Sequence, residues 1–419
     1  NPENKMNLEK YSIGTGDRFG LQGKAQLAAI QKAHEKGVDI TIVWNKSHRE
    51  HTIVGTSQQA VRKEADLAVT TNNWHGQYLV DADHIGLSNV DLFLDSSDFF
   101  TLDVADFIGK EADEKKISDF ILKNEKYTGE LIVPGIDKPL KISRELIENV
   151  AKKYLFAIEE AGEIYRYIAK VKGSSSFITE VSMDETADPQ TPVELFFILS
   201  AIADENIPAQ TIAPKFSGRF NKGVDYIGDL SQFTQEFEED LSVINHAINL
   251  FSLPENLKLS VHSGSDKFSL YPVIKDAIKK FDAGIHIKTA GTTWLEELIG
   301  LAEAEGEGLD IAKQIYLQAH DRFDELCSPY ASVIDIDPDK LPTPDEVLNW
   351  TAKQYINALR HDQSCPEYNN HLRQLLHVGY KVAAELGDTY LNALRSNEEV
   401  VAKNVTENLF TRHIKPLFL

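Results

Sequence analysis

The chain has 419 residues, of which 42% are hydrophobic, so it is long and apolar enough for one large domain or two ordinary ones. Its 65 acidic and 43 basic residues give a formal charge of −22, which argues against binding to nucleic acid or to anionic membrane surfaces. No apolar run approaches the roughly 18 residues that a membrane-spanning helix needs. Only two cysteines occur, which suits a reducing compartment. We therefore expect a cytoplasmic protein with neither a nucleic-acid nor a membrane partner.

Short runs of β-branched and aromatic residues alternate with helical patterns along the chain, most of them followed by a helix. One such helix begins at Thr191, a good N-cap, with Pro192 in its first position. The eight strand candidates are residues 11–16, 39–44, 77–83, 99–106, 177–185, 209–216, 257–264 and 284–291. This count and alternation predict an α/β fold, a (β/α)8 TIM-like barrel of parallel strands. An open doubly wound sheet is the alternative, but the chain has no GxGxxG motif to support it.

Two stretches depart from the simple alternation. Residues 107–172 are too long for one connection; they contain helical patterns near 112–125 and 143–171, with a β-hairpin between them that turns at Pro134-Gly135. Beyond residue 291 the patterns are nearly all helical. We expect a catalytic barrel over residues 1–300, with an insertion at about 107–172, and a helical C-terminal extension over residues 301–419 that packs on the barrel.

Ionisable side chains follow nearly every predicted strand, at the end where the active site of such a barrel lies. His84 follows the third strand and His262 ends the seventh, so both imidazoles are expected to point to one place. With a carboxylate they would form a mixed nitrogen and oxygen site for zinc, manganese, iron, cobalt or nickel, rather than for calcium. Asp81 and Asp103 have a simpler alternative, which is to cap the next helix or to pair with a lysine.

Seven segments resemble one known family, in order along the chain. They are GTGDRFG (14–20), VWNKSHREHT (43–52), DADHIGL (81–87), FLDSSDFFTLDVADFIG (93–109), EVSMDET (180–186), APKFSGRFNKGVDYIGDL (213–230) and LSVHSGSDKFS (259–269). Together they resemble the tagaturonate/fructuronate epimerase family of bacterial hexuronate breakdown. The resemblance implies a metal-dependent isomerase that interconverts D-tagaturonate and D-fructuronate. It also implies metal ligands at His84, Asp229 and His262, a proton acceptor at Asp83 and a proton donor at Glu185.

The substrate of such an enzyme carries a carboxylate, so an acidic protein must supply cations locally. The candidates at or after the strand ends are Lys46, Arg49, Lys215, Arg219, Lys222, Lys267 and Lys288. The backbone amides of residues 289–293, which open a helix, would also suit an anion.

The two epimers differ at C4, whose proton is not α to the C2 ketone. A metal-stabilised retro-aldol cleavage of C3–C4 is one route. Direct proton removal at C4, whose carbanion would be poorly stabilised, is the other, and both stay open. Two other functions remain open. One is a metal-dependent sugar aldolase or ketose isomerase on the same barrel, and the other is a non-catalytic sugar-acid-binding protein. The expected partner is a small sugar acid, and a homo-oligomer is possible.

Overall fold

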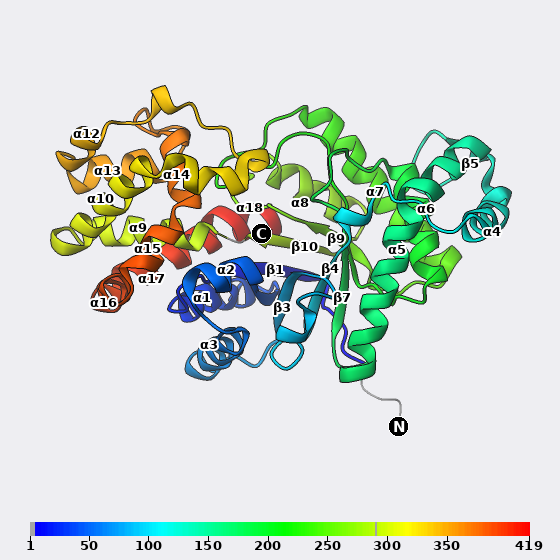
Figure 1. Cartoon of the computed structure of the whole chain (residues 1–419), viewed down its shortest axis with the longest axis horizontal. Helices are drawn as coiled ribbons and strands as arrows, with labels where there is room; N and C mark the ends of the chain where they lie inside the picture. The colour runs from blue at the N-terminus through cyan, green and yellow to red at the C-terminus, as the bar shows by residue number, and fades with distance from the viewer. Residues whose placement is uncertain (1–4, 290) are drawn as a thin grey trace.

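A closed barrel of eight parallel strands forms the centre of the molecule in the computed structural model, which describes residues 5–289 and 291–419 (Figure 1). Around the barrel the strands follow the order β1-β10-β9-β8-β7-β4-β3-β2. They are β1 (Tyr11–Gly16), β2 (Thr41–Ser47), β3 (Tyr78–Ile85), β4 (Phe99–Asp103), β7 (Ile178–Ser182), β8 (Thr211–Ala213), β9 (Lys258–Val261) and β10 (Ile285–Thr289). The predicted (β/α)8 fold is confirmed.

Helices follow most strands and cover the outside of the barrel (Figure 1). They are α1 (Gly23–Glu35), α2 (His48–Val54), α3 (Gln58–Thr71), α6 (Pro192–Asp204), α7 (Leu230–Phe251), α8 (Tyr271–Lys280) and α9 (Thr292–Glu303), with short 3-10 helices η1 (Val90–Leu92) and η2 (Ala105–Phe107). At α6 the predicted cap is present: Thr191 accepts from the amide of Glu194, whose side chain accepts from the amide of Thr191. Helix α2 was not predicted; Ser47 caps it in the same way.

The insertion after β4 forms a separate lobe of the barrel surface, where α4, β5 and α5 lie together (Figure 1). It consists of α4 (Glu114–Asn124), a 3-10 turn η3 (Glu125–Tyr127), β5 (Gly129–Leu131), β6 (Leu140–Ile142) and the long helix α5 (Arg144–Lys172). The antiparallel pairing of β5 with β6 confirms the predicted hairpin. Gly135 has a φ of +97°, which favours glycine at this turn.

The inner wall of the barrel changes from apolar to polar along the strands. Val43, Leu79, Phe99 and Ile178 form an apolar cluster with Leu8 at the N-terminal ends of the strands. Because side chains alternate between the two faces of a strand, Asp81 and Asp83 point to the same side of β3 as Leu79. The apolar layer therefore closes the barrel beneath a polar layer, which lies toward the end where ligands bind in this fold.

The C-terminal extension and α9 together form a second hydrophobic core, separate from that of the barrel. Its elements are α10 (Gly306–Asp321), α11 (Phe323–Cys327), 3-10 turns η4 (Ser328–Val333) and η5 (Pro338–Lys340), α12 (Pro344–Leu348), α13 (Ala352–Leu359), α14 (Asn370–Val378), α15 (Tyr380–Leu386), α16 (Asp388–Ser396), α17 (Glu398–Glu407), a π-helical segment η6 (Asn408–Ile414) and α18 (Lys415–Phe418). The last residues return to the barrel, where the Phe418 ring lies 5.0 Å from that of Tyr11. Within the described part of the chain, no helix has the length and apolarity to cross a bilayer. The domain boundary near residue 300 stays a prediction.

Replacing Gly300 with alanine is expected to loosen the contact between α9 and α17. A Cβ at Gly300 would lie 2.7 Å from the Cα of Val401 and 2.9 Å from its Cγ2, so the backbone of α17 would have to move. Such overpacking costs about 1–3 kcal/mol of unfolding free energy. Gly86→Ala is the control, because a Cβ there meets nothing within 4 Å. Urea denaturation of both variants measures the difference; equal stabilities would contradict the close packing of these helices.

Candidate active site

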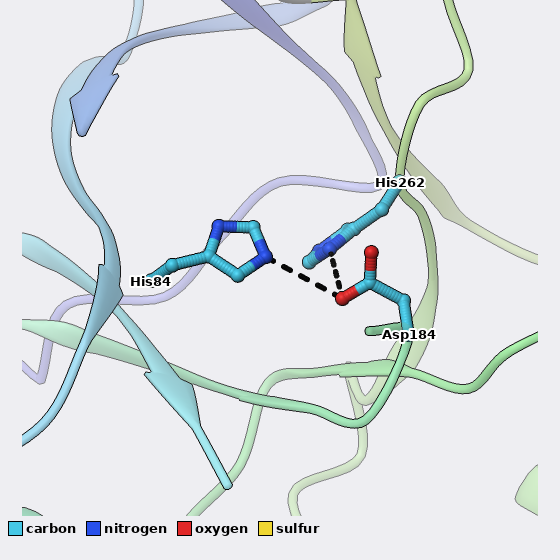
Figure 2. A group of neighbouring side chains, drawn as sticks. All are labelled: His84, Asp184 and His262. Carbon is cyan, nitrogen blue, oxygen red and sulfur yellow. Dashed lines mark hydrogen bonds and ion pairs between the residues drawn. The ribbon is translucent and has the colours of Figure 1, made fainter. Parts of the chain in front are cut away.

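Two histidines and an aspartate converge at the C-terminal ends of the barrel strands (Figure 2). Oδ1 of Asp184 lies 2.9 Å from Nδ1 of His262 and 3.4 Å from Nε2 of His84. His84 is the last polar residue of β3, Asp184 follows β7 and His262 follows β9. The structure thus brings His84 and His262 together, as expected from the sequence, and it adds Asp184 between them.

Each of these histidines has a second carboxylate on its other ring nitrogen. Nδ1 of His84 donates to Oδ1 of Asp83 at 2.8 Å, and Nε2 of His262 donates to Glu180, which is completely buried. A carboxylate on the far nitrogen fixes the tautomer of a metal-binding histidine and directs the lone pair of the near nitrogen at the metal. Nε2 of His84 and Nδ1 of His262 are therefore the two nitrogens directed at the shared point.

Lys288, at the end of β10, balances the charge of the carboxylates beneath the histidines. Its Nζ lies 3.0 Å from Oδ2 of Asp81, 3.2 Å from Oδ1 of Asp83 and 3.2 Å from Oε1 of Glu180. It also donates to the Thr101 hydroxyl at 2.7 Å. The lysine side chain is only 5% exposed, so these ion pairs lie in a poorly solvated part of the barrel.

The pKa values in the cluster follow from burial and from this charge arrangement. Burial lowers the pKa of His262, but Asp184 and Glu180 raise it to about 9 overall. For His84, burial again lowers the pKa, and Asp83 and Asp184 more than reverse this effect. Burial raises the pKa of Asp184, yet the two histidines hold it well below its usual value. Acidic groups thus make this point favourable for positive charge, whether on a proton or on a bound cation.

The backbone that carries the two histidines departs from regular strand geometry. The pairing of β3 with β4 shifts register between Ala82 and Ile85, and His84 itself has a φ of +55°. Ser263, directly after His262, has a φ of +51°. Such conformations are costly for residues other than glycine and are concentrated at functional sites. Here the irregular strand end directs His84 across the mouth of the barrel toward His262.

The proposed acid and base lie on opposite sides of the His84 ring. Asp83 contacts Nδ1, and Oε1 of the exposed Glu185 lies 3.8 Å from Nε2. Glu185 also forms a second possible metal group with His84 and Asp103. The simpler roles expected of the neighbouring acids, pairing with a lysine or capping a helix, are both found. Asp81 pairs with Lys288, and Asp103 accepts from the amide of Ala105 at the start of η2.

Asp229, the third metal ligand expected from the resemblance, lies outside both groups found among the described residues. It is the N-cap of α7, where its Oδ1 accepts from the amides of Ser231 and Gln232 at 2.9 and 3.1 Å. The side chain is exposed. In this structure Asp184, and not Asp229, is the aspartate that contacts both histidines.

The lysines expected to bind substrate are used mainly to fix loops. Lys46 donates to the carbonyl of Arg18 at 2.8 Å, Lys215 to that of Thr186 at 2.5 Å, and Lys267 to that of Asn221 at 2.9 Å.

The two arginines in the same set lie at the surface. Arg49 is placed over the Tyr330 ring, and the half-exposed Arg219 is 3.6 Å from Asp335. The predicted anion site at 289–293 includes Ala290, which lies outside the described residues.

Sequence reasoning missed the roles of Asp184, Glu180 and Lys288. Glu180 and Asp184 lie in the segment EVSMDET, where only Glu185 is given a role, and Lys288 is named only as one of several cations. The signal was present in the alternation of the strands: Glu180 and Lys288 lie in barrel strands, where a charged side chain on the inner face must find a partner. The sequence does not indicate which of the acids would pair with Lys288.

Comparison with known proteins agrees with this fold and with the resemblance. The family model UxaE, described as tagaturonate epimerase, matches residues 1–417. The tagaturonate/fructuronate epimerase of Thermotoga maritima is 27% identical, with the match covering 97% of this chain and 80% of that protein.

Two solved structures of fructuronate-tagaturonate epimerase UxaE from Cohnella laeviribosi share the fold at 23% identity. The form complexed with one glycerol has a TM-score of 0.81 and covers 99% of this chain and 82% of that one. The native form has a TM-score of 0.78, with coverages of 98% and 82%. The family match extends over nearly the whole barrel and its extension, so this chain belongs to the UxaE family of tagaturonate epimerases and is an isomerase of the carbohydrate epimerase type.

Proposed function

We propose that this protein interconverts D-tagaturonate and D-fructuronate at C4, with a divalent cation bound by His84, His262 and Asp184. Membership of the UxaE family supports the reaction. The observation that carries the metal proposal is the arrangement of two histidines whose near nitrogens face one carboxylate oxygen and whose far nitrogens each contact another carboxylate. That arrangement is typical of metal ligands held in place by outer acids.

The donor set fits a transition metal. One ligand atom each from His84, Asp184 and His262 lies within 4.8 Å of the others. Nδ1 of the buried His262 has no hydrogen-bond partner of adequate geometry within the described residues, although the Asp184 oxygen is close. Mixed imidazole and carboxylate ligands suit manganese, zinc, cobalt, nickel or iron. Such a cation, when bound, would act as a Lewis acid that stabilises negative charge on the oxygen atoms of the substrate.

The acids around the histidines suit a retro-aldol route. In this route a base accepts the proton of the C4 hydroxyl, C4 becomes an aldehyde, and the electrons of the C3–C4 bond pass into an enediolate of C1–C3. The aldehyde then turns over, the C3–C4 bond forms again on its other face, and an acid returns a proton to the C4 oxygen. We assign the accepting role to Asp83 and the donating role to Glu185, because they lie on opposite sides of His84.

Lys288 supports this assignment through its charge. Burial raises the pKa of Asp83, but His84 and Lys288 lower it more, so Asp83 is held in the ionised form from which a proton acceptor must start. Burial also raises the pKa of the neighbouring Asp81 to about 7, against the opposing charge of Lys288. The lysine thus keeps a concentration of acids stable at the base of the site. Recognition of the substrate carboxylate by Lys46, Arg49, Lys215, Arg219 or Lys267 stays a prediction, as does a homo-oligomer.

An NMR experiment in deuterium oxide tests both the reaction and the route. Incubation with D-tagaturonate is expected to yield D-fructuronate that retains hydrogen at C4, because the C4 hydrogen stays on the aldehyde carbon during a retro-aldol step. Deuterium at C4 would show direct proton removal instead. Release of three-carbon fragments would identify an aldolase, C1/C2 isomers would identify a ketose isomerase, and binding without turnover would identify a sugar-acid-binding protein.

A further inference from the structure

Three side chains of the C-terminal extension converge on a single residue of the active-site loop, Asp266. This aspartate follows His262 by four positions and is completely buried. Its Oδ1 accepts from Nδ1 of His361 at 3.0 Å and from a guanidinium nitrogen of Arg373 at 3.1 Å, and its amide donates to Nε2 of His413 at 3.1 Å. The sequence gives no hint of this group, because the three side chains lie 95, 107 and 147 positions beyond Asp266 in the chain.

Arg373 also joins this loop to the loop after β8. It is fully buried in α14, and besides Asp266 it donates to the carbonyls of Gly223 at 2.6 Å and Leu359 at 3.0 Å. Gly223 lies in the loop after β8, the same loop that contains Asp229. One guanidinium therefore connects the β8 loop, the β9 loop and the helical extension. A buried arginine with a single carboxylate partner and two carbonyl partners fixes these segments in one relative position.

His413 makes its contact from an unusual stretch of helix. Its Nδ1 donates to the carbonyl of Asn408 at 2.9 Å, which leaves Nε2 as the acceptor for the amide of Asp266. The residues from Asn408 to Ile414 are π-helical, a rare geometry that is often found where a helix serves a function. Here it directs the imidazole of His413 at the loop.

The loop between His262 and Asp266 needs such support. Ser263 and Asp266 have φ values of +51° and +60°, a region that is unfavourable for side chains other than glycine. The amide of Gly264 donates to the carbonyl of Lys288 at 3.0 Å, so the loop also contacts the strand end that carries the central lysine. Within the loop, the Ser265 hydroxyl donates to Oδ2 of Asp266 at 2.8 Å. The contacts of Asp266 with His361, Arg373 and His413 add support from outside the loop.

We propose that Asp266 and Arg373 are positioning residues, through which the C-terminal extension holds the loop of His262 in the geometry that epimerisation requires. This inference rests on the proposed function for its effect on turnover. The role of the extension is then to fix the active-site loops with its helices, from the side of the barrel mouth. Neither residue contacts the His84, Asp184 and His262 group, so both act through the backbone of the loop.

The variant Asp266→Asn/Arg373→Met tests the proposal. Removing both charges together avoids an unpaired buried charge, so the protein is expected to fold. We expect kcat to fall about 10- to 100-fold, as is usual for groups that orient a metal ligand, with a smaller change in KM. Amide hydrogen exchange of residues 263–267, measured by mass spectrometry, is expected to become at least about tenfold faster, because the strained loop loses its support. If this variant does not fold, His413→Phe removes the acceptor of the Asp266 amide, together with the hydrogen bond to the Asn408 carbonyl, and is judged by the same two measurements.

Tyr316→Phe is the matched control in the extension. It removes the buried hydrogen bond from the Tyr316 hydroxyl to the carbonyl of Pro342, and so lowers Tm without touching the β9 loop. Its kcat and the exchange of residues 263–267 should stay at wild-type values. Wild-type kcat and wild-type exchange in the double variant would overturn the proposal. If the wild-type protein itself lacks epimerase activity, the proposed function fails, and hydrogen exchange alone then decides the positioning role.

Discussion

Replacing Lys288 with methionine is expected to destabilise the protein by about 3–5 kcal/mol at neutral pH, the usual cost of removing one partner from a buried ion pair. Three carboxylates, those of Asp81, Asp83 and Glu180, lie within 3.2 Å of the lysine nitrogen. Without the lysine, they would remain buried and would repel one another. Epimerase activity is expected to fall as well, because Asp83 would lose one of the two positive charges, His84 and Lys288, that lower its pKa.

The loss of stability in this variant should depend on pH. Burial raises the pKa of a carboxyl group, and Lys288 is the charge that opposes this effect at Asp81 and Glu180. In Lys288→Met the folded pKa of Asp81, already about 7, therefore rises further above that of the unfolded chain, and the pKa of Glu180 rises as well. The folded state then binds more protons than the unfolded state, so stability is retained at low pH and lost as the pH rises through the folded values.

Urea denaturation between pH 5 and pH 8 measures this effect. The difference in unfolding free energy between wild type and Lys288→Met should widen as the pH increases. Lys258→Met is the control, because Lys258 is also buried but, among the described residues, its ammonium forms hydrogen bonds only with the backbone carbonyls of Leu8 and Glu9. Burial lowers the pKa of Lys258 to about 7. A Lys288→Met variant as stable as this control at pH 8 would show that the lysine does not balance the buried acids.

Replacing Asp184 with asparagine is expected to lower epimerase activity by more than about 100-fold. Loss of an outer partner of a metal site costs about 10- to 100-fold, and Asp184 would be a direct ligand. The affinity for Mn²⁺, measured by calorimetric titration of metal-stripped protein, should fall in parallel. Asparagine keeps the size of the side chain, so Tm should change little.

Asp229→Asn is the matched control for Asp184→Asn, because the resemblance to the family implies that Asp229 is the third metal ligand beside His84 and His262. Asparagine is as good an N-cap as aspartate, so the start of α7 should be preserved. If Asp184 is the ligand, this variant retains both activity and metal affinity. The reverse result, with Asp229→Asn inactive and Asp184→Asn active, would assign the metal to Asp229 and contradict the ligand set proposed from the structure.

The fold was predictable because barrel strands and helices are specified locally. Strands such as 11–16 and 99–103 are short, rich in β-branched or aromatic residues, and bounded by turn residues. The helix cap at Thr191 is likewise specified by the four residues from Thr191 to Glu194. The hairpin in the insertion was found for the same reason. The boundaries were less exact: β2 continues to Ser47, because Asn45 and Lys46 are buried in the barrel wall despite their polarity.

The site was only partly predictable because its members meet through tertiary structure. His84 and His262 could be paired from their places at two strand ends. The choice among Asp184, Glu185 and Asp229 depends on the course of two loops, which residue types do not specify. The direction of His84 depends on a shift in strand register at Ala82 to Ile85, and no local pattern encodes it. The contacts of Asp266 with the extension join segments about a hundred residues or more apart.

The epimerase activity of metal-stripped protein tests the proposed metal site most directly. The protein is incubated with D-tagaturonate, with and without Mn²⁺, Zn²⁺, Co²⁺ or Ni²⁺, and D-fructuronate is followed by NMR, with His84→Ala as the control. Fructuronate is expected to form only when a metal is added, and not in the variant. Full activity without metal, or undiminished activity in His84→Ala, would contradict a metal site at His84, Asp184 and His262. No turnover with any of the metals would contradict the epimerase function.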